Sequence, residues 1–236
     1  VPIPDCSTIM PIKINIGTAT PGAHNQTVIY NWTPIPDDIT SKARVRVSTQ
    51  ENNASINVED ISDADFKIKG QVTVTQPNTN LTWYVGELKP IKWSSIGTVT
   101  PVKIEYSPDN ATNWYTINSS FPAVEGNNEF NWTVGNLKNT TCLIRISDAR
   151  TAFTSEVTDV SDTLFTVLPQ LNVTQPVASQ NVTAYSNNTP IRWTYTGTTV
   201  NNVNTYYSTD AGANWTLINS SIPVTQNGTY IWPSVP

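Results

Sequence analysis

Two short stretches of the chain carry residue types that acid–base chemistry can use. STDAGANW runs from Ser208 to Trp215 and follows the pattern S-x-D-x-G-x-x-W, whereas SPDNATNW, from Ser107 to Trp114, lacks the glycine. A carboxylate acts as a general acid or base only when it comes within hydrogen-bond reach of a substrate. The first question is therefore whether these residues form a catalytic site or a turn.

The pattern is similar to the Asp box of sialidases, in which it is a structural turn. Asp and Gly favour tight hairpins, because an Asp side chain accepts hydrogen bonds from nearby backbone N–H groups and Gly adopts positive φ. Propeller blades recur at about 40 to 50 residues, whereas this sequence repeats at 99 to 101. We interpret both stretches as turns, with Trp215 packing on the domain, and we expect no enzymatic activity.

The remaining candidates for catalysis or metal binding are isolated. His24 is the single histidine and lies in the loop PGAHNQT, so no Ser/His/Asp set can be argued around it. Asp60, Asp63 and Asp65 in DISDAD have the spacing of a calcium loop. The repeated segment DVSDTL retains only two of these acids, which favours a turn. We expect neither a metal nor a cofactor.

The tryptophans divide into predicted core residues and one predicted surface residue. Trp93 and Trp132 fall at inward positions of alternating segments, as do Ile104 and Ile144, so all four are predicted to be buried. Trp83 lies in the segment LTWYVGE, which we interpret as a loop. It is the tryptophan that we expect to be exposed and able to stack on a sugar.

The composition excludes several classes of partner. The chain has 236 residues, with 13 Lys or Arg against 18 Asp or Glu, and this acidic balance argues against a nucleic-acid surface. It contains neither a signal-peptide pattern nor an apolar run of about 18 residues, so we expect no membrane span. Cys6 and Cys142 allow either one disulfide or two free thiols.

Acceptor triplets for N-glycosylation, Asn-x-Ser/Thr, are unusually frequent. The chain has 14 of them, against about 6 expected by chance for this composition. A composition rich in Asn and Thr is the alternative explanation, but dense glycosylation also accounts for the sparse charge. We predict covalent N-glycans and a location outside the cell or on its surface. The acceptors are Asn25, Asn31, Asn53, Asn80, Asn110, Asn118, Asn131, Asn139, Asn172, Asn181, Asn187, Asn214, Asn219 and Asn227.

The sequence repeats itself with a period of 99 to 101 residues. VTVTQP returns as LNVTQP, PIKW as PIRW, and VKIEYSPDNATNWYTINSS as VNTYYSTDAGANWTLINSS. Near the start, VIYNW, ARVRVS and DISDADFKIKG match NEFNW, CLIRIS and DVSDTLFTVLP. The chain is therefore predicted to contain the back of one unit within residues 1–70, a whole unit at 71–169 and the front of another at 170–236.

The repeated segments have the alternation of half-buried antiparallel strands. VKIEY places Val102, Ile104 and Tyr106 on one face, with Lys103 and Glu105 on the other. Turn-forming residues separate these segments, and about seven short strands fall within each 100 residues. The predicted fold class is all-β, with tandem immunoglobulin-like β-sandwiches whose terminal units are incomplete.

The spaced pattern VTQP, PIKW, VKIEYS, FNW and CLIRISDA resembles a surface-protein module. It is similar to the Ser/Thr-rich cell-wall glycoprotein family typified by yeast glucan-assembly proteins, and to tandem modules of prokaryotic surface proteins. The resemblance covers the complete unit and parts of both ends, whereas residues 1–24 have no clear match. It implies an immunoglobulin-like sandwich outside the cell, with a structural or adhesive role and no catalytic residues.

Each incomplete unit has strands that the other lacks, which leads to a hypothesis of assembly. A front half and a back half would each expose an apolar face and open strand edges. Strand addition between copies would complete both and generate a head-to-tail polymer. We expect a structural subunit of a glycosylated extracellular filament, with an adhesive or carbohydrate-binding module of a longer repeat protein as the alternative. The N-terminal arm is expected to cross to the neighbouring copy through Ile3, Ile9, Ile12, Ile14 and Ile16.

Overall fold

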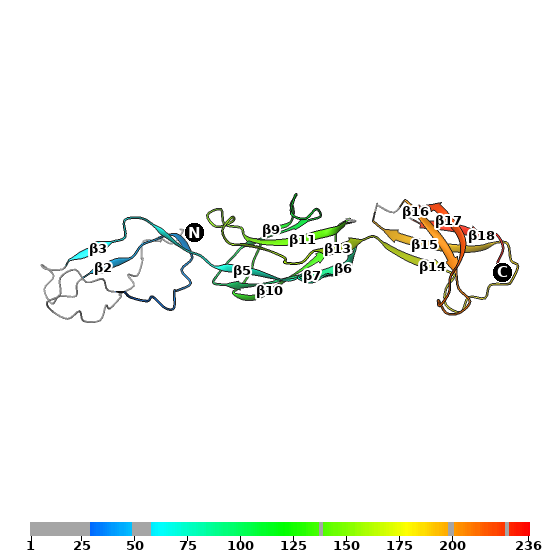
Figure 1. The fold of residues 1–236 in the computed structure, drawn as a ribbon, viewed down its shortest axis with the longest axis horizontal. Helices are drawn as coiled ribbons and strands as arrows, with labels where there is room; N and C mark the ends of the chain where they lie inside the picture. The colour runs from blue at the N-terminus through cyan, green and yellow to red at the C-terminus, as the bar shows by residue number, and fades with distance from the viewer. Residues whose placement is uncertain (1–28, 49–57, 137–138, 198–200, 225–226) are drawn as a thin grey trace, which may run out of the picture. The chain divides into compact units, whose positions relative to one another are not determined.

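The structure is a computed structural model that describes residues 29–48, 58–136, 139–197, 201–224 and 227–236. All regular elements within these ranges are β-strands, which confirms the predicted all-β class (Figure 1). None of the described residues forms a helix of the length and apolar character needed to cross a membrane. The chain divides into two compact units, residues 1–69 and 70–236.

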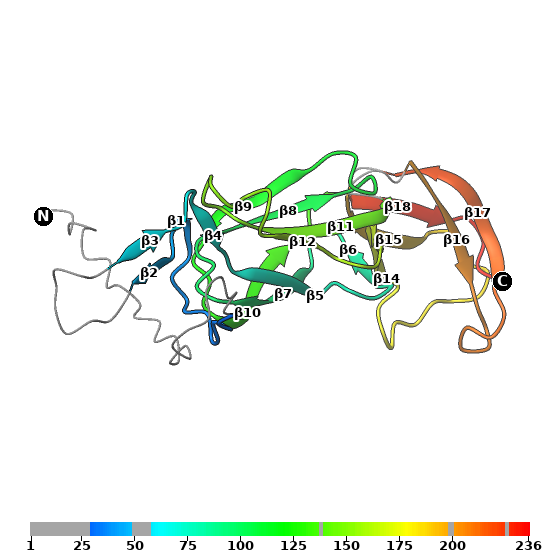
Figure 2. The same ribbon diagram turned by 60° about the vertical axis from the view of Figure 1, so that its left-hand side comes forward.

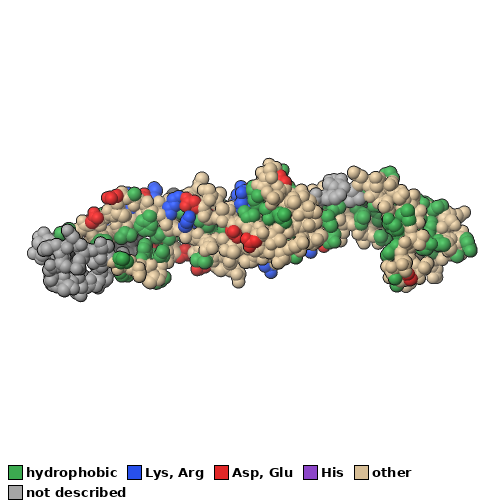
Figure 3. Space-filling model, viewed as in Figure 1, with side chains coloured by type: hydrophobic (Ala, Val, Ile, Leu, Met, Phe, Trp, Pro, Cys, Tyr) green, Lys and Arg blue, Asp and Glu red, His purple; other side chains and the backbone are tan. Residues whose placement is uncertain are grey.

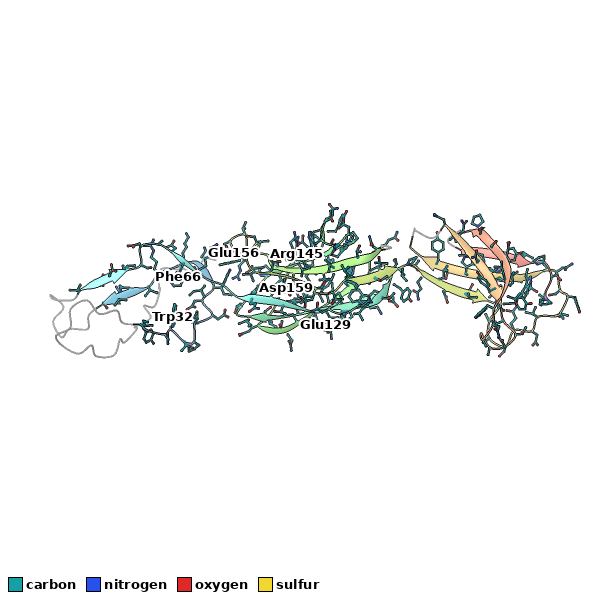
Figure 4. All side chains as sticks on the ribbon, in the orientation of Figure 1. Trp32, Phe66, Glu129, Arg145, Glu156 and Asp159 are labelled. Carbon is teal, nitrogen blue, oxygen red and sulfur yellow. The ribbon has the colours of Figure 1, made fainter. Side chains whose placement is uncertain are left out.

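The described residues of the first unit form four short strands. They are β1 (Thr40–Ala43), β2 (Arg46–Ser48), β3 (Glu59–Ile61) and β4 (Phe66–Ile68). Strand β1 pairs with β4 and β2 pairs with β3, both antiparallel. The Trp32 ring meets the Phe66 ring edge-on, with 6.5 Å between the centroids (Figure 4).

In the second unit, the described residues between 70 and 169 form nine strands in two facing layers. The first layer has the strand order β10-β7-β5, and the second has the order β6-β13-β11-β8-β9, with β12 paired to β11. Figures 1 and 2 show one layer lying over the other. The strands are β5 (Gln71–Gln76), β6 (Thr82–Tyr84), β7 (Leu88–Ile96), β8 (Val102–Ser107), β9 (Tyr115–Phe121), β10 (Gly126–Thr133), β11 (Asn139–Asp148), β12 (Thr158–Val160) and β13 (Phe165–Leu168).

The core between these layers comes from the alternation seen in the sequence. Ile104 and Ile144 are completely buried, and Trp93 and Trp132 are nearly so, which confirms the prediction for all four residues. Trp132 stacks on Tyr106 at a centroid distance of 5.4 Å, which joins the inner faces of β10 and β8. Aromatic and β-branched side chains of this kind fill the space between two packed sheets.

Five further strands repeat part of this arrangement. Strands β14, β15 and β18 form one sheet, and β16 and β17 form another. Gly228 pairs with Trp193 between β18 and β15, and a Cβ there would overlap the Trp193 ring as it lies in this structure. The strands are β14 (Gln170–Gln175), β15 (Thr189–Thr196), β16 (Asn202–Tyr207), β17 (Thr216–Pro223) and β18 (Asn227–Trp232). The predicted domain boundaries at residues 70 and 169 remain predictions.

Candidate assembly surface and neighbouring sites

The stretch from Ser208 to Trp215 forms a turn in which the Asp210 carboxylate is fully engaged. Ser208 Oγ donates to Asp210 Oδ1 at 2.7 Å. The backbone N–H of Asn214 donates to the same oxygen at 2.8 Å, and Asn214 Nδ2 donates to Oδ2 at 2.6 Å. The backbone N–H of Gly212 donates to Ser208 Oγ at 2.9 Å. These local bonds, led by that from the Asn214 backbone, lower the pKa of Asp210 to about 2.

The earlier stretch repeats this network bond for bond. Asp109 Oδ1 accepts from Ser107 Oγ and from the Asn113 backbone N–H, both at 2.8 Å, and Asn113 Nδ2 donates to Oδ2 at 2.6 Å. Hydrogen bonds from Asn113 lower the pKa of Asp109 as well. Both stretches form turns, as predicted from their sequences, and both carboxylates serve to hold the turn.

The tryptophans that close the two turns differ in their surroundings. The guanidinium carbon of Arg145, on β11, lies 4.1 Å from the centroid of the Trp114 ring, which places a cation over the ring face. Its counterpart Trp215 is 63% exposed. The expectation that Trp215 packs on its own domain is therefore wrong for this structure. The cation over Trp114 comes from a distant strand, whereas the Trp215 ring lies beside Gly212 of its own turn.

The prediction that Trp83 is exposed is also wrong. Trp83 is only 3% exposed and belongs to β6, which pairs in parallel with β13. Its ring centroid lies 4.8 Å from that of Phe165 and 6.2 Å from that of Trp132. Trp83 is a core residue, so it is not available to stack on a sugar.

An open hollow of about 560 Å³ lies beside Glu105 and is lined by residues of β8, β11, β12 and the segment 151–155. Arg145 donates to Glu105 Oε2 through Nε at 2.9 Å and Nη2 at 2.7 Å, while Lys103 Nζ lies 2.5 Å from Oε1. Burial opposes ionisation of Glu105, but the bonds from Lys103 and Arg145 outweigh it and lower the pKa of Glu105. The carboxylate is thus committed to two cations and forms a structural ion-pair network.

The other predicted sites contain no assembled metal centre. Within the described ranges, no three His, Cys, Asp or Glu residues are grouped so that they could hold a metal ion. Asp65 instead receives a 2.6 Å bond from Arg44 Nε. Cys142 is a free, buried thiol, and burial raises its pKa to about 11. His24, Cys6 and the five isoleucines of the predicted arm lie outside the described residues.

Eleven of the 14 predicted glycan acceptors have side chains that the structure describes, and none of these is buried. Asn118, Asn139 and Asn219 are half-buried, and each accepts a hydrogen bond from a backbone N–H one or two residues later. Eight are exposed, namely Asn31, Asn80, Asn110, Asn131, Asn172, Asn181, Asn187 and Asn214. Asn25 and Asn53 lie outside the described residues, as does the side chain of Asn227. The eight exposed side chains are therefore the acceptors most open to glycan attachment.

The first unit reproduces the register of β11, β12 and β13 at a constant offset of 99 residues. Ala43 pairs with Phe66 as Cys142 pairs with Phe165, and Arg46 pairs with Ile61 as Arg145 pairs with Val160. The repetition extends to side chains. Ser62 Oγ accepts from the Val45 backbone N–H at 3.2 Å, just as Ser161 Oγ accepts from that of Ile144 at 3.1 Å. Strands β1 to β4 are thus the structural counterparts of β11 to β13.

The C-terminal strands reproduce the other part of the complete unit. Val203 pairs with Ile222 as Val102 pairs with Phe121, and Val173 pairs with Trp193 as Val74 pairs with Trp93. Strands β14, β15, β16, β17 and β18 are the counterparts of β5, β7, β8, β9 and β10. Among the described residues of the C-terminal repeat, no strand takes the place of β11 or β13.

Residues that are buried in the complete unit are exposed at corresponding positions of the two partial ones. Val74 is 1% exposed, whereas its counterpart Val173 is 65% exposed. Val72 is 4% exposed, whereas its counterpart Leu171 is 52% exposed. In the first unit, Val47 is 46% exposed, whereas its counterpart Ile146 is completely buried. Apolar side chains are accordingly visible over the C-terminal strands in Figure 3. We call Leu171 and Val173 on β14 the front face, and Val47 on β2, which pairs with Asp60, the back face.

One hydrogen bond shows how the complete unit covers the equivalent of the front face. The backbone N–H of Val74 on β5 donates to Asp159 Oδ2 on β12 at 2.7 Å, and β5 also contacts β11 (Figure 4). Sequence reasoning interpreted Asp159 and its counterpart Asp60 only as turn residues. The recurrence of this acid in both repeats is the signal in the sequence that could have drawn attention to it.

No protein-family model matches this chain, and no match was found among curated proteins.

Proposed function

We propose that this chain is a structural subunit of an extracellular, N-glycosylated filament that assembles head to tail by strand complementation. One observation carries the proposal: the chain contains a front half and a back half of the same strand arrangement, and each half exposes the side chains that the other half covers in the complete unit. Open strand edges and exposed apolar faces favour association. A contact between unlike ends need not close, so it extends into a linear polymer.

We further propose that the complete unit is an immunoglobulin-like β-sandwich, related to the Ser/Thr-rich cell-wall module that its sequence resembles. Its two facing layers, antiparallel apart from the parallel pair of β6 and β13, support this assignment. The exposed glycan acceptors support a location outside the cell, because N-glycans are attached to secreted chains. Engagement of both turn carboxylates in local bonds supports a structural role over a catalytic one.

A carbohydrate-binding or adhesive module is the second candidate, favoured by the exposed Trp215 ring. Tyr206 on the adjacent strand β16 is 47% exposed, so two aromatic side chains are accessible on this repeat. The two candidates make different predictions for Trp215→Ala. An adhesive module loses glycan binding as a monomer, whereas a filament subunit loses association between copies.

The test is multi-angle light scattering of the recombinant 236-residue chain over a range of concentrations, beside a chain that lacks residues 1–18. The full chain should give an open-ended series of oligomers that grows with concentration. The truncated chain should remain small, since it lacks the arm expected to cross to its neighbour. A full chain that stays monomeric at every concentration contradicts the proposal. Normal polymers from the truncated chain contradict only the role of the arm.

A further inference from the structure

We propose that strands β1 to β4 of one copy cover the front face of a second copy in the register that β11 to β13 use within the complete unit. This inference rests on the proposed function and deepens it, because it names which strands meet and which side chains face each other. It assigns an interface to the first unit beyond the arm, and its partner is a second copy of this chain.

The register follows from the pairing of β11 with β8. There, Ile144 lies opposite Tyr106 and Ser147 lies opposite Lys103. Residues of β1 and β2 lie 99 positions before their counterparts in β11, and residues of β16 lie 101 positions after their counterparts in β8. The same register would therefore place Val45 opposite Tyr207, and Ser48 opposite Asn204, of the neighbouring copy. Both halves keep the registers of the complete unit in their internal pairs, so the two can join without rearranging either one. Main-chain hydrogen bonds along β16 would supply affinity in the usual manner of strand addition.

Side-chain chemistry across the proposed junction also matches. Arg46 is the counterpart of Arg145, and Trp215 is the counterpart of Trp114. The cation over the tryptophan ring would therefore come from the first unit of one copy, and the ring from the C-terminal repeat of the other. In the first unit, Arg46 has an exposed contact with Glu59 Oε2 at 3.5 Å, which is a weak ion pair. It is therefore available to move over the Trp215 ring, which is 63% exposed.

A second polar contact would form across the same junction. Asp60 is the counterpart of Asp159, which accepts the backbone N–H of Val74. In the assembled pair, the Asp60 carboxylate would accept the backbone N–H of Val173 in the neighbouring copy. The match is incomplete along β16, where Asn204, Thr205 and Tyr206 stand at the positions of Lys103, Ile104 and Glu105. Arg46 would therefore face a phenol ring where Arg145 has a carboxylate, which leaves the contact with Trp215 as its main interaction.

The proposed contact would also bury apolar side chains that are exposed in a single copy. Val47 of one copy would take the position of Ile146, which is completely buried in the complete unit. Leu171 and Val173 of the other copy would take the positions of Val72 and Val74, which are 4% and 1% exposed. Removing these side chains from water favours association in proportion to the apolar area covered.

Arg46 tests the side-chain part of the proposal. Replacing it by Ala removes the cation over Trp215, so assembly should need about a tenfold higher concentration of chain. Arg192→Ala changes an exposed arginine of β15 that has no place in the proposed contact, and it should leave assembly unchanged. Equal effects of the two substitutions contradict the assignment of Arg46.

Disulfide trapping tests the register in the full-length chain. Every variant carries Cys6→Ser, and Cys142 is retained because its thiol is buried, with a pKa raised to about 11. The matched pair combines Ser48→Cys on one chain with Asn204→Cys on another. The control combines Ser48→Cys with Asn202→Cys, which lies two residues away on the same face of β16. Opposed residues of a strand pair are close enough for a disulfide, whereas residues displaced by two are about 7 Å apart or more.

Chains with a single engineered thiol are mixed and mildly oxidised, so that a mixed dimer can arise only between copies. We expect the pair at residues 48 and 204 to give at least tenfold more mixed disulfide dimer than the pair at 48 and 202. Equal yields, or a larger yield from the control, overturn the proposed register. If the same chains still form filaments, the proposed function stands while this inference fails. If the chains neither cross-link nor associate, both fail.

Discussion

The backbone N–H of Val74 donates to Asp159 Oδ2 across 2.7 Å, which joins β5 of one layer to β12 of the other. The two residues are 85 positions apart in the sequence, so this bond connects the front and the back of the complete unit. Hydrogen bonds to charged groups contribute more than neutral ones, especially where water is partly excluded. The bond therefore contributes to holding the two layers together.

We expect Asp159→Ala to lower the free energy of unfolding by about 1.5 to 3 kcal/mol, the range for a hydrogen bond to a charged group. Stability is lost because the substitution leaves the backbone N–H of Val74 beside β12 without a hydrogen-bond acceptor. Urea unfolding monitored by tryptophan fluorescence measures the change. Glu125→Gln, at an exposed acid, is the matched control and should have little effect. A stability equal to that of the parent chain would show that the bond contributes nothing.

Ala111 offers a stabilising substitution. It has a φ of 65° where its counterpart Gly212 has 91°, so an alanine occupies the left-handed conformation in one of two equivalent turns. That conformation costs a residue with a Cβ about 1 to 2 kcal/mol. Glycine avoids this cost, but it loses more conformational entropy on folding, which cancels part of the gain. Ala111→Gly should therefore raise the free energy of unfolding by about 0.5 to 1 kcal/mol. Ala152→Gly, in a turn without positive φ at that residue, should lower it, and a loss at both positions would refute the argument.

The turn at Asp210 should persist in acid. Its pKa in the folded chain is about 2, below the ordinary value of 3.8, so the ionised carboxylate stabilises the turn at pH values above 3.8. That contribution declines as the pH falls from 3.8 through 2. An NMR titration of the Asp210 carboxyl carbon should give a midpoint near 2, and Asn214→Ala should move it towards 3.8. A midpoint of 3.8 in the parent chain would mean that the local bonds do not form in solution.

Native material should carry N-glycans at many of the exposed acceptors. Its intact mass should exceed the 26.0 kDa of the bare chain and return close to that value after enzymatic removal of the glycans. Peptide mapping should find occupancy among the eight exposed asparagines, because a glycan needs open solvent around its attachment point. A native mass of 26.0 kDa would refute the glycoprotein hypothesis.

Local patterns in the sequence were sufficient for the strands and for most of the core. Alternation at period two places Ile104 and Ile144 inward, and both are completely buried. Such an alternation is visible in a few adjacent residues, since successive side chains of a strand point to opposite faces. The repeat also predicted that Asp109 and Asp210 occupy equivalent positions. Each carboxylate accepts hydrogen bonds from the backbone and the side chain of the asparagine four residues later.

Contacts between distant segments were not predictable in the same way. Trp83 was expected in an exposed loop, but β6 pairs with β13, whose residues lie some 84 positions later, and Phe165 then covers the ring. Trp215 was expected to pack against its own domain, yet the cover over its counterpart Trp114 is Arg145 of β11. In both cases the deciding partner lies far away in the sequence, where neither alternation nor turn chemistry reports on it.

Electron microscopy of the purified chain tests the central claim most directly. The claim is that copies associate head to tail because each has a front face and a back face that complete one another. Negatively stained samples of the recombinant 236-residue chain, taken over a range of concentrations, should show linear filaments of uniform width with a fixed axial repeat. Compact particles of one size at every concentration would contradict the account.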